Sequence, residues 1–326
     1  MGSRMPNSHQ HIKKTIDAAR LEDYTKFRLG GPCRFLVNCE TPAELIQAVQ
    51  ELQSQNIPYL LIGGGSNLVV SDDGIDAAVI RYASSSPIIE RDGNDIIVSG
   101  STELDALAVF CVNEGLEGLN YTSGIPGTVG GAVIGNAGAW GKQVGDVIKS
   151  VTIIPQIRRG GVTAPLNINN QDCGFSYRHS KLKETGDIVV SVRFALTKGD
   201  PMALAQERAE ILKKRAEKHP NLKTHPCAGS FFRNVEPTSK AGHRQAAGWF
   251  LEEAGGKNLR VGGAQIFDKH ANIIVKGPNC KAQDVYDISR KMIGIVKEKF
   301  GFELKREVRF VGKFKTADNY NEQGFW

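Results

Sequence analysis

The sequence of 326 residues lacks the cysteine patterns of disulfide scaffolds and zinc sites, and it lacks any long apolar run. No stretch approaches the roughly 20 apolar residues that cross a bilayer, and the start MGSRMPNSHQHIKK has no apolar segment of a secretory signal. We therefore expect a cytoplasmic protein with no membrane partner. The six cysteines include no CxxC pair, so we expect free thiols and no metal site; they are Cys33, Cys39, Cys111, Cys173, Cys227 and Cys280.

Two familiar nucleotide-binding motifs and one hydrolase motif are also missing. A Rossmann fingerprint needs glycine at its first, third and sixth positions; Gly63 and Gly65 fit, but the sixth position is Leu68. The nearest approach to a P-loop, NAGAWGKQ, has Asn136 for its first glycine and Gln143 for the hydroxyl residue that binds magnesium. The frame G-x-S-x-G is absent, which argues against hydrolase chemistry.

The charge of the chain favours a small anionic ligand over nucleic acid. A net charge of +6 suits either partner, but no basic stripe with interleaved aromatic residues is present. The basic stretch at residues 208–223 is the strongest case for nucleic-acid binding, and such charge runs are usually solvated helix faces. We therefore expect no nucleic-acid partner.

The remaining patterns predict alternating strands and helices in three regions. A helix begins at Thr41 with Pro42 at its first position and presents Leu45, Val49 and Leu52 on one face. Further strands read IIVSG, SVTIIP and DIVVSVRFAL, and a strongly helical stretch runs over residues 201–219. The predicted division is a polar leader at 1–22, regions at 23–85, 86–199 and 200–312, and a polar, peripheral tail at 313–326.

Two glycine-rich stretches stand out, LLIGGGSNLVV at residues 60–70 and SGIPGTVGGAVIGNAGAWG at residues 123–141. Glycine in a row permits sharp bends, positive φ and close approach of another molecule. A tight turn between two strands explains an isolated triplet equally well. Neither stretch has a charged residue near its centre, yet an array of backbone N–H groups can hold a diphosphate without lysine.

Eight segments in collinear order resemble the UDP-N-acetylenolpyruvoylglucosamine reductase (MurB) family. They span residues 28–312 and read RLGGP, IGGGSNLVVSD, GIPGTVGGAVIGNAGAWG, FSYRHS, CAGSFFRN, AGWFLEEAG, RVGGAQIFDKHANIIV and REVRFVG. The resemblance implies an α+β chain: a two-subdomain FAD-binding fold of the vanillyl-alcohol-oxidase (PCMH) type at 23–85 and 86–199, plus a separate α/β substrate-binding domain at 200–312. Too few residues lie between 200 and 312 for the inserted tyrosine loop of some members, so the chain resembles the shorter type.

The same resemblance implies FAD as cofactor, NADPH as reductant, a UDP-sugar substrate and, as we expect, a monomer. Covalent FAD attachment in this fold often uses a His beside the first glycine loop, and this chain has Ser66 and Asn67 there, so we expect non-covalent FAD. The implied FAD-binding residues are Gly63, Gly64, Gly65, Ser66, Asn67, Ser123, Gly124, Ile125, Pro126, Gly127, Thr128, Gly130, Gly131, Asn136 and Gly138.

Three residues match the family's catalytic positions. The implied reaction turns an enolpyruvyl ether into a lactyl ether, and its hard step is the negative charge that develops on the substrate. Arg178 in FSYRHS would grip the carboxylate, Ser230 in CAGSFFRN would donate a proton, and Glu307 in REVRFVG would contact the carboxylate with a pKa raised by burial. Alternation in REVRF places Glu307 and Arg309 on one strand face. An exposed Arg306–Glu307 or Glu307–Arg309 pair is the structural alternative.

The implied substrate-binding residues are Tyr177, Lys218, Arg233, Asn234, Gln265 and His270. Arg233 departs from the lysine that the family pattern has at this position. His270 also suits a purely structural role. Two other functions stay open: another FAD-dependent oxidoreductase of the same fold, which would not need Arg178, Ser230 and Glu307, and a nucleotide-binding module without activity.

Overall fold

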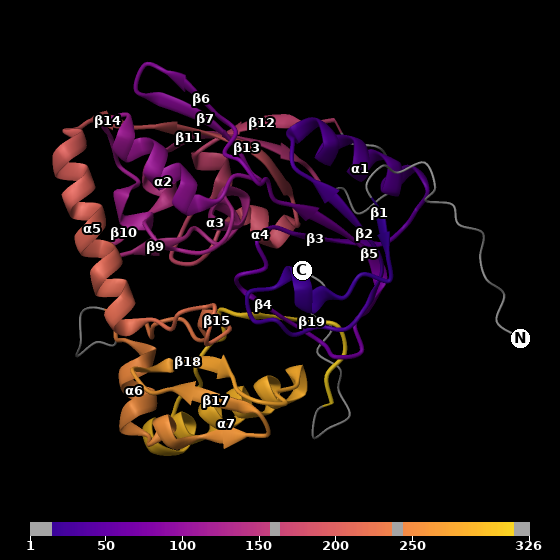
Figure 1. Ribbon diagram of the computed structural model, residues 1–326, viewed down its shortest axis with the longest axis vertical. Helices are drawn as coiled ribbons and strands as arrows, with labels where there is room; N and C mark the ends of the chain where they lie inside the picture. The colour runs from indigo at the N-terminus through magenta and orange to yellow at the C-terminus, as the bar shows by residue number, and fades with distance from the viewer. Residues whose placement is uncertain (1–14, 157–163, 237–243, 316–326) are drawn as a thin grey trace, which may run out of the picture.

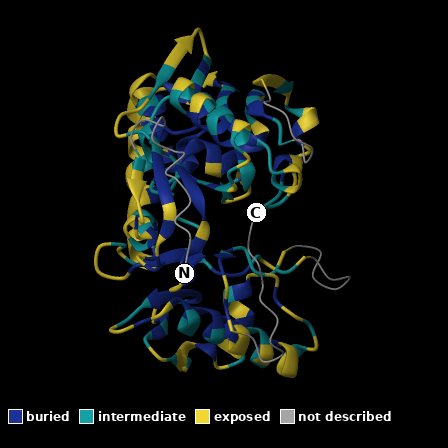
Figure 2. Cartoon of the chain, turned by 90° about the vertical axis from the view of Figure 1, so that its right-hand side faces the viewer, coloured by how far each residue is buried: buried dark blue, intermediate teal, exposed yellow. Residues whose placement is uncertain are grey.

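The computed structural model describes residues 15–156, 164–236 and 244–315 (Figure 1). The predicted leader and tail lie partly outside the described residues. None of the helices within these ranges is both long and apolar enough to cross a membrane. Figure 2 shows the buried residues gathered inside both the upper part of the molecule and the lower part, which contains α6 (Ala247–Glu253) and α7 (Ala282–Phe300).

The first sheet has the strand order β1-β2-β5-β3 and carries helix α1. As predicted, Thr41 caps α1 by accepting the N–H of Glu44, and Pro42 is its first residue. The apolar face of α1 is buried against the sheet through Leu45, Val49 and their neighbours. The bounds are β1 (Thr15–Asp17), β2 (Cys33–Cys39), α1 (Pro42–Ser54), β3 (Tyr59–Ile62) and β5 (Ile75–Tyr82).

The second sheet is antiparallel, with the order β12-β11-β13-β7-β6, and its core takes in helices α2 and α3. Short strands and 3-10 helices connect its longer elements. The main bounds are β6 (Ile89–Asp92), β7 (Asp95–Ser99), α2 (Leu104–Asn113), α3 (Val129–Ile134), β11 (Ile148–Ile154), β12 (Leu166–Asn169), α4 (Lys181–Thr185) and β13 (Ile188–Ala195). The short elements of this region are β8 (Leu116–Glu117), η2 (Asn120–Thr122), β9 (Gly138–Ala139), β10 (Lys142–Gln143), η3 (Val144–Asp146), η4 (Gln171–Cys173) and β14 (Thr197–Lys198), whereas η1 (Leu21–Tyr24) lies between β1 and β2 of the first sheet.

The long helix α5 (Pro201–Lys218) leads from this sheet to the third one, along one side of the molecule (Figure 1). The third sheet has the order β15-β18-β17-β16, with α6 and α7 packed in its core. Its bounds are β15 (Cys227–Ser230), η5 (Gly256–Asn258), β16 (Arg260–Val261), β17 (Ala264–Phe267) and β18 (His270–Lys276).

The first and third regions of the chain are joined by a separate two-stranded sheet. Strand β19 (Arg309–Val311) pairs in parallel with β4 (Leu68–Val70), which directly follows the first glycine stretch. Phe27 and Leu29 also belong to the core of the third sheet. The first and third regions of the chain therefore share apolar core.

Both predicted ends of the folded part need correction. β1 pairs with β2, and Leu21 is buried, so the first sheet begins inside the predicted leader. Phe314 is buried and stacks on Tyr286 with ring centroids 5.5 Å apart, so the tail begins in the core instead of at the periphery. In both cases an apolar side chain is buried within a mainly polar segment. The other predicted boundaries remain predictions.

Candidate active site

The two glycine stretches lie against each other. A Cβ built on Gly63 would be 2.3 Å from Oγ1 of Thr128, and one built on Gly64 would be 3.2 Å from Cα of Gly127. Gly65 has a φ of +60°, and its Cβ would meet the backbone oxygen of Tyr24 at 2.1 Å. Three successive glycines are therefore required by close approach and by positive φ, which explains why the sequence has them here.

Main-chain N–H groups without an internal partner gather where these loops meet. Among the described residues, the amides at 63–67 and those of Gly127 and Thr128 have no hydrogen-bond acceptor. Such groups cost free energy when they stay unpaired away from water. Neutral N–H groups in a narrow cradle are a donor set that suits a diphosphate. The residues present thus fit the phosphate part of a dinucleotide such as FAD.

Fewer N–H groups in the second glycine stretch are unpaired than the sequence led us to expect. The Gly124 amide donates to Asp105, that of Gly130 to the oxygen of Gly100, and that of Gly131 to Oγ1 of Thr128. Ser123 and Ile125 also use their amides internally. Residues 129–134 form α3 and the others lie in turns, so these five N–H groups are already bonded within the protein. Contact of these residues with FAD remains a prediction.

Asn67 connects the first glycine loop to the predicted glutamate. Its side-chain amide donates to the backbone oxygen of Glu307 at 3.1 Å, and its own backbone oxygen accepts the N–H of Arg309 at 3.1 Å. The N–H of Glu307 in turn donates to the oxygen of Phe231 at 2.9 Å. Because Ser230 directly precedes Phe231, these bonds bring the serine segment, the glutamate segment and the glycine loop together.

Arg178 reaches the same place from a tight turn. Ser176 and His179 exchange backbone hydrogen bonds of 3.1 Å, which leaves Arg178 at a φ of +55°. A non-glycine residue in this conformation costs on the order of 1 kcal/mol or more and persists where its surroundings fix it. Here the Asn136 side chain donates to the oxygen of Ser176 at 2.8 Å. Asn136 therefore supports the arginine turn through its side chain.

Arg178 and Glu307 form an ion pair, with Nε and Oε1 3.1 Å apart. Their side chains are 24% and 21% exposed, so the pair is largely shielded from water without being closed off. Burial raises the pKa of Glu307 and outweighs the charges of Arg178, Arg233 and Lys183, which lower it. The predicted effect of burial on this carboxyl group is confirmed. The alternative of an exposed pair with Arg306 or Arg309 does not describe Glu307.

The charge around this carboxyl group is strongly positive. Burial lowers the pKa of Lys183, and the charges of Arg233 and Arg309 lower it further, while Glu307 opposes them. Lys183 and Arg309 were absent from the predicted site. Arg309 begins β19, two residues after Glu307, so the strand predicted over REVRF starts later than expected and does not include Glu307. Lys183 follows Arg178 by five residues. The excess of cations favours a ligand with several negative charges.

Three predicted substrate-binding residues lie next to each other. The hydroxyl of Tyr177 accepts the backbone N–H of Asn234 at 3.2 Å, and the Arg244 guanidinium stands 3.9 Å from the centre of the Tyr177 ring. Nε of Arg233 is buried and has no hydrogen-bond partner among the described residues. A buried donor of this kind is usually satisfied by water or by a ligand. Tyr177 and Asn234 are thus in direct contact, next in the chain to Arg178 and Arg233 respectively.

The other three predicted contacts stand apart. His270 packs against His219 with ring centroids 5.8 Å apart, and Lys218 is exposed at the end of α5 beside them. The Gln265 side chain contacts Arg260 on the neighbouring strand. Within the described part of the chain, no hydrogen bond or ion pair links Lys218, Gln265 or His270 to Glu307. Their role remains a prediction.

Comparison with known proteins gives matches over both parts of the chain. Residues 33–156 match the family described as FAD binding domain, and residues 219–311 match the one described as UDP-N-acetylenolpyruvoylglucosamine reductase, C-terminal domain. The UDP-N-acetylenolpyruvoylglucosamine reductase of Caldanaerobacter subterraneus is 33% identical over 90% of this chain and 92% of its own length. That of Caldicellulosiruptor bescii is 35% identical over 91% and 90%.

A solved structure agrees with these sequence matches. The crystal structure of UDP-N-acetylenolpyruvylglucosamine reductase (MurB) from Thermus caldophilus superposes with a TM-score of 0.73 at 32% identity. The match covers 91% of this chain and 98% of the other. The similarity in structure thus extends across all three sheets.

Proposed function

Because the chain belongs to the UDP-N-acetylenolpyruvoylglucosamine reductase family, we propose that it reduces UDP-N-acetylglucosamine enolpyruvate to UDP-N-acetylmuramate, a step of peptidoglycan precursor synthesis. FAD is its cofactor and NADPH its reductant. The observation that carries the proposal is the Arg178–Glu307 ion pair joined through Asn67 to the unpaired amides of the first glycine loop. That arrangement places anion-binding groups directly beside a candidate cofactor cradle.

In this proposal the amides at 63–67 and those of Gly127 and Thr128 hold the diphosphate of non-covalent FAD. The chemistry that FAD supplies when bound is hydride transfer, from NADPH to the enol ether carbon. The close contact of Gly64 with Gly127 leaves no room for side chains between the loops. Main-chain donors therefore approach the phosphates directly, and no lysine is needed.

Arg178 and Glu307 act on the substrate carboxylate. When the enol ether is reduced, negative charge develops over its α-carbon and carboxylate, and the planar guanidinium of Arg178 can bond two oxygens at once. Glu307, with its raised pKa, keeps a proton more readily than an ordinary glutamate, so it can donate a hydrogen bond to the carboxylate. The nearby charges of Lys183, Arg233 and Arg309 add to this stabilisation.

Ser230 gives its hydroxyl proton to the α-carbon. A hydroxyl is a poor acid in water, but a carbanion-like carbon held in contact is basic enough to take its proton. Ser230 ends β15, one residue before the backbone bond that ties Phe231 to Glu307. The hydroxyl thus belongs to the segment that borders the carboxylate site.

The UDP part of the substrate binds over the lower part of the molecule in this proposal. Tyr177, Arg233 and Asn234 lie nearest to Arg178, whereas Lys218, Gln265 and His270 extend the surface further away. The lower part then serves as a substrate-binding domain at 200–312. The two FAD-binding subdomains are formed by residues 23–85 and 86–199. We propose that the protein is a cytoplasmic monomer.

An anaerobic experiment tests the activity. The purified protein is reduced with NADPH, UDP-N-acetylglucosamine enolpyruvate is added, and the flavin absorbance is followed. Return of the absorbance together with formation of UDP-N-acetylmuramate is the expected result. Reduction without reoxidation by this substrate would favour another oxidoreductase of the same fold, and no reduction by NADPH would favour a binding module without activity.

A further inference from the structure

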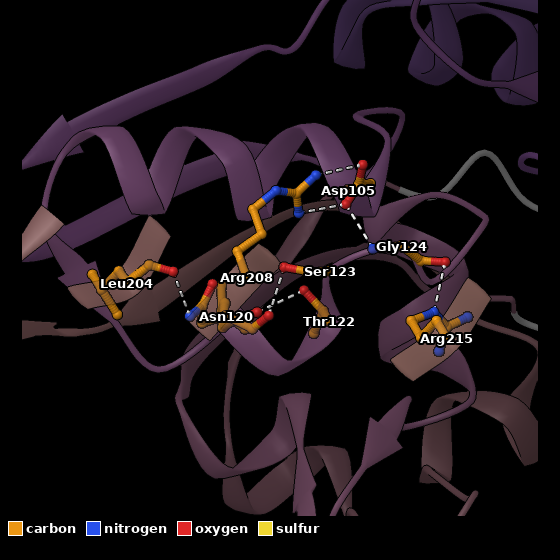
Figure 3. Close-up of polar contacts among 9 residues, drawn as sticks. Asp105, Asn120, Thr122, Ser123, Gly124, Leu204, Arg208 and Arg215 are labelled. Carbon is orange, nitrogen blue, oxygen red and sulfur yellow. Dashed lines mark hydrogen bonds and ion pairs between the residues drawn. The ribbon is translucent and has the colours of Figure 1, made fainter. Parts of the chain in front are cut away.

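The peptide groups of Gly124 are held from both sides by residues outside its own loop (Figure 3). Its N–H donates to Oδ1 of Asp105 at 2.7 Å, and its oxygen accepts the Nε–H of Arg215 at 3.1 Å. Asp105 belongs to the first turn of α2, and Arg215 to the last turn of α5. Gly124 is therefore fixed by two helices and not by the turn alone.

Arg208, also on α5, completes this contact. It bonds both carboxylate oxygens of Asp105, from Nη1 to Oδ1 at 2.7 Å and from Nη2 to Oδ2 at 3.0 Å (Figure 3). Burial tends to raise the pKa of Asp105, but the hydrogen bonds from Arg208 and Gly124 outweigh it, and the pKa is lowered. The carboxylate thus stays ionised and acts as a bridge between α5 and the loop. Two parallel bonds of this kind also fix the angle between their partners.

Steric contacts put α5 directly on the loop. Gly124 has a φ of +72°, and a Cβ on it would lie 2.9 Å from Cδ2 of Leu212 and 3.2 Å from Nε of Arg215. Helix α5 buries few of its own apolar side chains, namely Leu204 and Ile211. It is therefore attached to the FAD-binding part largely by polar bonds, including that from Asn120 to the oxygen of Leu204 at 3.0 Å.

The loop that α5 holds leads straight to two unpaired amides. Pro126 is the only residue without an N–H between Gly124 and Thr128, and the N–H groups of Gly127 and Thr128 have no acceptor among the described residues. Any rotation of the Gly124 peptide groups changes the direction of the amides that follow. The C-terminal end of α5, which carries Arg215, continues through residues 219–226 into β15, which ends in Ser230.

We propose that Asp105, Arg208 and Arg215 are positioning residues for the cofactor: through them α5 sets the Gly124 backbone and thereby aims the Gly127 and Thr128 amides at the FAD diphosphate. The inference rests on the proposed function, in which these loops hold FAD. It adds residues that touch neither cofactor nor substrate and that act through the loop. Removal of the clamp should weaken FAD without changing the reacting groups.

The test measures FAD affinity of the apoprotein by quenching of flavin fluorescence. We expect Arg208→Gln and Asp105→Asn each to raise the Kd of FAD at least tenfold, which corresponds to about 1.4 kcal/mol. The double variant should bind FAD within twofold of the weaker single variant, because both substitutions break one contact. With FAD at saturating concentration, kcat should return to within twofold of the unsubstituted protein.

Arg193→Gln is the matched control, because Arg193 also pairs with aspartates, Asp92 and Asp95, at 3.0 and 3.1 Å. It should change the Kd less than twofold. Equal Kd values for Arg208→Gln and the unsubstituted protein would overturn the proposal. If Arg208→Gln does not fold, Arg215→Lys replaces it, since this variant keeps the charge and removes the Nε donor. We expect the same tenfold rise in the Kd of FAD, and an unchanged Kd would refute the clamp.

A further variant separates this inference from the proposed function. Gly64→Ala places a Cβ 3.2 Å from Cα of Gly127 and should weaken FAD strongly wherever the loops hold it. Weak binding by Gly64→Ala with normal binding by Arg208→Gln would refute only the clamp. Normal binding by both would refute the placement of FAD against the two glycine loops, and the clamp with it.

Discussion

Replacing Ser230 by alanine separates proton donation from the rest of the site. The Ser230 hydroxyl makes no hydrogen bond with another described residue, and the pairing of its strand with Ile273 involves only the backbone. Alanine therefore leaves no buried group unsatisfied. We expect the free energy of unfolding to change by no more than about 0.5 kcal/mol.

The effect on the reaction should be far larger. A positioned general acid contributes about 10²-fold to 10⁴-fold to a rate, which corresponds to about 2.7 to 5.4 kcal/mol of activation free energy. Arg178 and Glu307 remain in place in this variant, so the developing charge is still stabilised. The loss should thus fall on protonation alone.

Stopped-flow spectroscopy under anaerobic conditions measures the two half-reactions separately. Reduction of the Ser230→Ala variant by NADPH should keep the rate of the unsubstituted protein, while reoxidation by UDP-N-acetylglucosamine enolpyruvate should slow by 10²-fold or more. Ser150→Ala is the control, because Ser150 is likewise a partly buried strand serine whose hydroxyl bonds no described residue. Unchanged reoxidation in Ser230→Ala would remove Ser230 from its role.

Three further predictions address charge, pH and backbone. Because burial raises the pKa of Glu307, kcat/KM of the unsubstituted protein should fall as pH rises through that pKa. The Glu307→Gln variant should not show this fall, and an identical fall in kcat/KM would contradict the role of Glu307. Burial lowers the pKa of His219 to about 4, below its unfolded value near 6.5, so stability should be full above about pH 6.5 and fall toward pH 4 by up to about 1.4 kcal/mol per pH unit. Urea unfolding of His219→Gln should show a flatter dependence over this range, and an unchanged slope would exclude His219 as the cause. Gly65→Ala should raise the Kd of FAD more than tenfold, because its Cβ would meet the oxygen of Tyr24 at 2.1 Å. Gly93 has a similar φ of +63°, but a Cβ there would lie in open space. Gly93→Ala should therefore lower the free energy of unfolding by only about 1 kcal/mol and leave the Kd of FAD unchanged.

Local signals in the sequence predicted several of the longer elements, among them α1 and α5. The cap at Thr41 and the spacing of Leu45 and Val49 suffice for α1, because both act within a few residues. Helix α3 was missed, since glycines at 130 and 131 disfavour a helix by propensity. Its cap, Thr128, was a usable signal.

Long-range contacts decided what the sequence could not show. Which amides stay unpaired depends on acceptors far along the chain, such as Asp105 for Gly124 and the oxygen of Gly100 for Gly130. Asp105 itself carried no motif, so nothing in its local pattern distinguished it from an exposed helix residue. Likewise, burial of Phe314 depends on Tyr286, which the polar composition around it conceals.

The parallel pairing of β19 with β4 determines when, during synthesis of the chain, the candidate site can form. The bond from Asn67 to Glu307 spans 240 positions of sequence, so its closure carries a large loop entropy and belongs to the slow, late events of folding. A nascent chain can complete the first glycine loop early, but it cannot bring Glu307 to that loop until the segment that leads into β19 has left the ribosome. Under the proposed function, a chain cut short before Glu307 should therefore be inert toward the substrate.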